Sequence, residues 1–236
     1  MSEYRTYDEK GEGRSRYPDF IKESQAVYQA TGDPALERIL NKKQGEYTIE
    51  DYYALPETCR VELIDGVIYN MAAPSYGHQG VGGELFFQFR RYIMERKGSC
   101  FPFMSPIDVQ LDQDDKTIVQ PDVIVACDRD KIKKQVYYGA PDLVVEVLSP
   151  SNTLKEQNLK YHKYKNAGVR EYWVVDPHKQ VVAVHDFEHG GAPVVYTFKD
   201  KVPVGIFAGE LEIDFAELYE NIRFLYEDKS STTNIK

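Results

Sequence analysis

The sequence predicts an α/β fold in which a mixed central sheet is flanked by helices. Segments whose apolar residues recur at helical spacing alternate with short apolar runs, in the order helix, strand, strand, strand, helix, strand, with added hairpins. The composition, 42% hydrophobic and 28% charged residues, is typical of a globular protein. At 236 residues the chain is long enough to bury a full core.

Three regions are predicted along the chain: a polar and partly helical extension over 1–45, a main domain over 46–227, and a disordered tail over 228–236. Within the extension, Asp33 followed by Pro34 is typical of a helix start. The main domain opens with RVELIDGVIYNM, in which apolar and polar residues alternate around Asp65-Gly66. This pattern predicts a β-hairpin.

A helix is predicted from about residue 78 to residue 97, because Val81, Leu85 and Phe89 recur at helical spacing. Strands are predicted next over 107–111, 119–127 and 143–148. A second helix follows, with Thr153 and Glu156 as its capping box and Gly168 at its end. The remaining predicted elements are a strand in EYWVVD, a hairpin formed by VVAVHDF and PVVYTF, and a last helix from Asp214 to about Glu227.

Cysteine usage and the N-terminal sequence predict a cytoplasmic protein. The three cysteines, Cys59, Cys100 and Cys127, show no paired or zinc-type spacing, so we expect no disulfide scaffold and a reducing compartment. The first 20 residues contain no apolar leader, and no apolar run approaches the roughly 18 residues of a membrane span. Secretion and membrane anchoring are therefore disfavoured.

A carboxylate, Glu146, lies in the middle of the apolar run LVVEVL. An ionised carboxylate buried without a partner costs several kcal/mol. A proton, a cationic side chain such as arginine, or a metal ion must therefore neutralise it.

A second carboxylate, Asp122, precedes the apolar strand before that of Glu146. It follows Pro121, so it could simply cap a turn. If the two strands are neighbours, however, the two acidic groups repel each other and are suited to bind a hard dication such as Mg²⁺. Asp142 also follows a proline, but at roughly 3.3 Å per residue it lies about 13 Å from Glu146 and is interpreted as a strand-start residue.

A positive charge could come from Lys160, on the helix after the Glu146 strand. Lys160 shares a helical face with Glu156 and Tyr164, and a helix packed on that strand could direct it at the carboxylates. Most lysines in a helix are solvated, and Lys155 and Lys163 remain alternatives on these grounds.

Together, RVELIDGVIYNM, His78, QPDVIVA, GAPDLVVEVLSPSN and AGVREYWVVDP resemble the Uma-two putative restriction endonucleases of the PD-(D/E)XK nuclease superfamily, over roughly residues 47–222. The resemblance implies a restriction-endonuclease-like core and a nuclease that uses Mg²⁺, which Mn²⁺ can replace. It implies Asp122 and Glu146 as metal ligands, with the Val147 carbonyl, and Lys160 as the catalytic lysine.

The resemblance also implies that Glu62 and His78 are accessory residues near the site. Glu62 could instead be a solvated hairpin carboxylate, and His78 a capping or packing residue. The sequence departs from the superfamily pattern at the second position after Glu146, where Leu148 replaces the usual lysine.

DNA is the predicted substrate, and a homodimer is predicted because cutting both strands needs two sites. The net charge of −9 argues against a nucleic-acid partner, since phosphate contacts favour a basic surface. Two alternatives follow: a catalytically inert nuclease-fold module that binds DNA or assembles with partners, and a metal-dependent hydrolase of small phosphorylated molecules.

Overall fold

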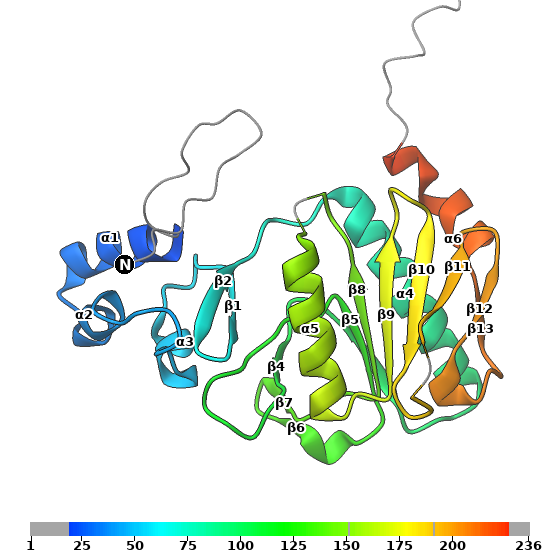
Figure 1. Cartoon of the computed structure of the whole chain (residues 1–236), viewed down its shortest axis with the longest axis horizontal. Coiled ribbons are helices and arrows are strands. Elements are labelled where there is room, and N and C mark those ends of the chain that lie inside the picture. Colours follow the sequence, from blue (N-terminus) through cyan, green and yellow to red (C-terminus); the bar gives the residue numbers. More distant parts are fainter. Residues whose placement is uncertain (1–18, 151, 191, 227–236) are drawn as a thin grey trace, which may run out of the picture. The chain divides into compact units, whose positions relative to one another are not determined.

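The computed structural model describes residues 19–150, 152–190 and 192–226, and the chain forms two compact units (Figure 1). The first contains residues up to 72 together with 114–118, and the second contains 73–113 and the residues from 119 onward. The boundary after residue 45 therefore stays a prediction, and the predicted tail over 228–236 lies outside the described residues.

The first unit is a small helical layer with one hairpin. Its elements are α1 (Asp19–Thr31), α2 (Pro34–Leu40), α3 (Ile49–Ala54), β1 (Val61–Ile64) and β2 (Val67–Asn70). The predicted helix start is confirmed, because Asp33 accepts a hydrogen bond from the Ala35 amide. The predicted hairpin is confirmed too: Asp65 and Gly66 both have positive φ, as a tight two-residue turn requires. A side chain at Gly66 would also lie 2.6 Å from the Gly45 carbonyl oxygen.

The second unit is built on a six-stranded mixed sheet in the order β11-β10-β9-β8-β5-β3. The neighbours β8 and β9 are parallel, and the other pairs are antiparallel. The strands are β3 (Phe101–Met104), β5 (Val123–Ala126), β8 (Leu143–Val147), β9 (Glu171–Asp176), β10 (Val181–Asp186) and β11 (Val194–Thr197).

Helices cover both faces of this sheet, as predicted. Figure 1 shows α5 (Leu154–Ala167) on one face, with α4 (Tyr76–Glu95) and α6 (Phe215–Ile222) on the other. Alternate residues of β5 and β8, such as Val123 and Val145, pack in one core with Leu85 and Phe89 of α4. The intervening residues of the same strands therefore point toward the α5 face. Trp173 is fully buried in the core.

The first strand of the core differs from the prediction. The segment predicted over 107–111 forms β4 (Asp108–Gln110), which belongs to a separate small sheet with β7 (Val136–Tyr138) and β6 (Ile132–Lys133). In the six-stranded sheet, the position beside β5 is occupied by β3, an edge strand that contains Pro102. Proline provides no backbone N–H and is tolerated at an edge. The helix–strand–strand–strand–helix–strand order is nevertheless kept, from α4 to β9.

One disulfide forms, although the cysteine spacing predicts no disulfide scaffold. Cys100 and Cys127 are joined by a disulfide, and Cys59 is free. The pairing arises because Phe101 lies opposite Ala126 in the antiparallel pair of β3 and β5, which places the two cysteines opposite each other at the next position. Their separation of 27 residues conceals this relationship in the sequence. The cysteines therefore no longer support a reducing compartment.

Both ends of α5 and the start of α6 follow the predicted signals, whereas α6 ends at Ile222, before the predicted end at about Glu227. The α5 helix has the Thr153–Glu156 capping box and ends at Gly168, whose φ is 93°. The α6 helix begins at Asp214, which caps the amides of Ala216 and Glu217. Over the described ranges, none of the helices combines the length and the apolar character needed to cross a lipid bilayer. The smaller elements are β12 (Lys201–Pro203), β13 (Glu212–Asp214) and the 3-10 turns Arg129–Lys131, Gly205–Phe207 and Arg223–Leu225.

Candidate active site at the ends of β5 and β8

The two predicted carboxylates lie opposite each other on neighbouring strands. In the antiparallel pair of β5 and β8, Val123 faces Val145, so the next position along the same register places Asp122 opposite Glu146. Side chains directly opposite each other in such a pair lie on the same face of the sheet. Glu146 is 9% exposed, and the Asp122 side chain is 16% exposed. The fold thus brings two acidic groups together at a largely buried position.

Asp122 is attached to the strand that carries Glu146. Its Oδ2 accepts a hydrogen bond from the Val147 backbone amide at 2.7 Å. The same oxygen lies 3.2 Å from Nε2 of His78. These contacts differ from the turn cap that the proline before Asp122 could suggest, because they join β5 to β8 and to the first turn of α4.

His78 faces the carboxylates and does not cap its helix through its side chain. The N-cap of α4 is Ser75, whose hydroxyl accepts a hydrogen bond from the His78 amide at 3.2 Å. Burial lowers the pKa of His78, but the hydrogen bond and charge of Asp122, with smaller contributions from Glu146 and the Val147 backbone, outweigh it. The net effect raises the pKa of His78 and favours an imidazolium beside Asp122.

Glu146 is held by two side chains of α5. Its Oε1 lies 3.0 Å from the Lys160 ammonium and 2.5 Å from the Tyr164 hydroxyl. Lys160 and Tyr164 are four residues apart, so they project from the same helical face onto the strand. Among the groups considered for neutralising the buried carboxylate, the structure shows the ammonium of Lys160 as a cationic partner.

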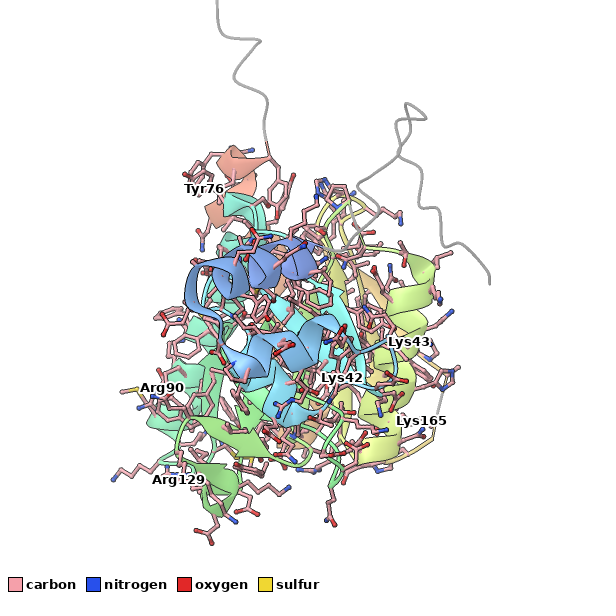
Figure 2. All side chains as sticks on the ribbon, turned by 90° about the vertical axis from the view of Figure 1, so that its left-hand side faces the viewer. Lys42, Lys43, Tyr76, Arg90, Arg129 and Lys165 are labelled. Atoms are coloured by element: carbon pink, nitrogen blue, oxygen red, sulfur yellow. A yellow bond between two sulfur atoms is a disulfide. The ribbon has the colours of Figure 1, made fainter. Side chains whose placement is uncertain are left out.

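The contacts distinguish Lys160 from the other lysines of α5. Lys163 forms an ion pair with Asp112, and Lys155 is exposed. Lys165 is exposed as well, on the α5 side of the view in Figure 2. Lys160, in contrast, has a side chain only 18% exposed and directed at Glu146. The sequence alone could not separate these lysines, because their positions depend on how the helix is rotated against the sheet.

Tyr164 is a site residue that sequence reasoning did not assign. Tyr164 lies four residues after Lys160, but the hydroxyl contact with Glu146 depends on the helix docking on β8. The side chain is fully buried. The available signal was therefore only the shared helical face with Lys160.

Glu62 belongs to the first unit, and Asp142 lies at the other end of β8 from Glu146. Glu62 is on β1 in the first unit, opposite Tyr69 across the hairpin, and is only 5% exposed, so it is not a solvated carboxylate. Asp142 precedes β8 at the end opposite Glu146, where it accepts a hydrogen bond from the Cys127 amide and pairs with Arg170. Asp142 is thus a strand-start residue, as predicted.

The site offers ligand atoms that are suited to a hard dication. Carboxylate oxygens of Asp122 and Glu146 and the backbone carbonyl of Val147 are of the oxygen type that Mg²⁺ prefers. The Val147 amide already binds Asp122, and along a strand the N–H and C=O of one residue point to the same side. The Val147 carbonyl therefore points toward the strand that carries Asp122.

A pocket lies at the carboxyl ends of β8 and β9. Leu148, directly after Val147, lines it together with Ser149, Asn152, Gln157 and His178. Such ends of neighbouring parallel strands, where a helix begins, are a common place for ligands in α/β proteins. The pocket therefore offers hydrogen-bonding groups one residue beyond the carboxylate site.

Comparison with known proteins places the chain in a family. The model of the Uma2 family, described as putative restriction endonuclease, matches residues 49–216. The chain belongs to the Uma2 family. The matched range includes His78, Asp122, Glu146, Lys160 and Tyr164.

Two further proteins are similar to parts of this chain. An uncharacterized protein from Synechocystis sp. is 31% identical over 115 residues, which is 48% of this chain and 59% of that protein. The crystal structure of a putative nuclease of the family DUF820 from Anabaena variabilis ATCC 29413 superposes with a TM-score of 0.61 at 23% identity. It covers 73% of this chain and 97% of the other, and at this identity it shows a shared fold.

Proposed function

We propose that this Uma2 protein is a magnesium-dependent endonuclease that hydrolyses phosphodiester bonds in DNA. The observation that carries the proposal is the pair Asp122 and Glu146, opposite each other on β5 and β8, with the Lys160 ammonium 3.0 Å from Glu146. Two carboxylates with a lysine beside them are suited to bind a dication and to act on a phosphate. Family membership supports a nuclease, and the metal and the DNA substrate are part of the proposal.

In the proposed mechanism Asp122, Glu146 and the Val147 carbonyl would hold one Mg²⁺. When bound, Mg²⁺ would supply Lewis-acid chemistry that activates water and offsets negative charge on the phosphate. Lys160 orients the attacking water or stabilises the extra negative charge of the transition state. His78 fixes the orientation of Asp122 through the 3.2 Å contact with Oδ2. An accessory role for Glu62 stays a prediction.

Cleavage assays on the full-length protein test this proposal. Supercoiled plasmid and single-stranded, duplex and branched oligonucleotides are incubated with Mg²⁺ or Mn²⁺, beside a panel of nucleotides. We expect Lys160→Ala to lose about 10²- to 10³-fold in cleavage rate, because a group that stabilises transition-state charge is removed. Lys155→Ala is the matched control, since that lysine lies exposed on the same helix. Its cleavage rate should equal that of the wild type.

The alternatives give different results in the same assays. Hydrolysis of nucleotides without DNA cleavage would indicate a hydrolase of small phosphorylated molecules, which the net charge of −9 favours. DNA binding with neither cleavage nor carboxylate-dependent metal binding would indicate an inert module. Wild-type cleavage by Lys160→Ala would show that the lysine is wrongly assigned. The homodimer and the cytoplasmic location stay predictions; sedimentation analysis tests the first.

A further inference from the structure

Two side chains donate hydrogen bonds to the same oxygen of Glu146, and they differ in their freedom to move. Lys160 reaches Oε1 with a long, flexible side chain that is 18% exposed. Tyr164 reaches the same atom with a hydroxyl at 2.5 Å, and its side chain is fully buried. The tyrosine is thus the more constrained donor and the lysine the less constrained one.

The Tyr164 ring is held by aromatic contacts across the sheet. It packs on Tyr172 of β9 with ring centres 5.1 Å apart. Tyr172 in turn stacks on His185 of β10, at 5.6 Å and an interplanar angle of 21°. A buried ring in such a row has few alternative rotamers, because interiors are closely packed. The hydroxyl position is therefore set by three neighbouring elements, α5, β9 and β10.

The proposed function requires Lys160 to interact with water or phosphate during the reaction. When its ammonium leaves Oε1, the largely buried Glu146 loses one of the hydrogen bonds to that oxygen, and a buried carboxylate needs its remaining lone pairs satisfied. The Tyr164 hydroxyl remains on that oxygen. It can keep the carboxylate in place while the lysine acts elsewhere.

We propose that Tyr164 is a positioning residue, which fixes the Glu146 carboxylate for the dication and allows Lys160 to exchange between Glu146 and the substrate. This inference rests on the proposed function. Groups that orient a ligating carboxylate typically contribute 10- to 100-fold to metal affinity. Tyr164 would therefore affect metal binding as well as turnover, which a residue with a purely structural role would not do.

Tyr164→Phe tests the proposal, because it removes only the hydroxyl and keeps the ring that packs on Tyr172. The binding of Mn²⁺ to the full-length protein is measured by calorimetry without DNA, beside thermal unfolding of each variant. We expect the Kd for Mn²⁺ to rise about 10-fold or more. Tyr161→Phe is the matched control on the same helix, since the Tyr161 ring contacts His162, His185 and Phe187. Its Kd should equal that of the wild type.

A second measurement uses the Lys160→Ala background. There the Lys160 contact is gone while Tyr164 still donates to Oε1, so Tyr164→Phe should raise the Kd for Mn²⁺ by a larger factor than in the wild type. An unchanged Kd in both backgrounds, with wild-type binding intact, would overturn the role of Tyr164 and leave the proposed function standing. Absence of Mn²⁺ binding to the wild type would overturn the proposed function and this inference with it.

Discussion

Oδ2 of Asp122 accepts a hydrogen bond from the Val147 backbone amide at 2.7 Å, which joins the start of β5 to the end of β8. An asparagine can preserve this bond through its carbonyl oxygen, whereas alanine leaves the amide without this acceptor. We expect Asp122→Ala to lower the free energy of unfolding by about 1–3 kcal/mol and Asp122→Asn by clearly less. Urea denaturation without added metal measures both, and equal losses would show that the hydrogen bond is not the anchor.

The half-buried ring of His185, which stacks on Tyr172, predicts a pH dependence of stability. Burial lowers the pKa of His185, with a smaller contribution from the charge of Lys165. The folded state therefore favours the neutral ring, so its contribution to stability is present above the unfolded pKa of about 6.5 and is lost as the pH falls through the lower folded value. His185→Phe should remove this loss of stability at low pH.

Thermal unfolding between pH 8 and pH 5 measures the effect. The Tm of the wild type should fall relative to that of His185→Phe as the medium becomes acidic. His162→Gln serves as the control, since His162 is exposed on α5. A difference in Tm between wild type and His185→Phe that does not change with pH would contradict the prediction.

The first turn of α4 is packed against Tyr226 where Gly77 precedes His78. A Cβ at Gly77 would lie 2.5 Å from the Tyr226 ring, whose hydroxyl is buried. Gly77→Ala should therefore destabilise the fold by roughly 1–3 kcal/mol. At Gly83, on the same helix, an added Cβ meets nothing within 4 Å, so Gly83→Ala should stabilise by roughly 0.5–1 kcal/mol. Chemical denaturation compares the two, and effects of the same sign would refute the packing argument.

The disulfide between Cys100 and Cys127 ties β3 to the end of β5. Replacing both cysteines by serine should lower the free energy of unfolding by about 2–4 kcal/mol, since the bond restricts the unfolded chain. Reduction of the wild type should have the same effect. Cys59→Ser is the control. Mass spectrometry after alkylation of the unfolded, unreduced protein should find a single free thiol, and three free thiols would contradict the pairing.

The sequence was sufficient to predict the parts of the site that depend on strand patterning. The run LVVEVL identified a buried strand with Glu146 inside it, and the apolar residues after Asp122 identified its neighbour. Because these two strands pair directly, the two carboxylates meet as expected. Helix ends were predictable for a similar reason, since caps such as Thr153 act through local contacts.

The features that sequence reasoning missed depend on tertiary arrangement. Pro102 concealed β3, because a proline argues against a strand unless the strand lies at an edge. The disulfide depends on a strand register that spans 27 residues. The hydroxyl contact of Tyr164 with Glu146 requires α5 to dock in one rotation about its axis. None of these can be read from local spacing alone.

A crystal structure of the full-length protein soaked with Mn²⁺ tests the central claim most directly. An anomalous peak should lie between the carboxylates of Asp122 and Glu146, about 2.1 Å from an oxygen of each, and should vanish in Glu146→Gln. Crystals that show Mn²⁺ bound elsewhere, with none between these two side chains, would contradict a shared dication as the basis of the site.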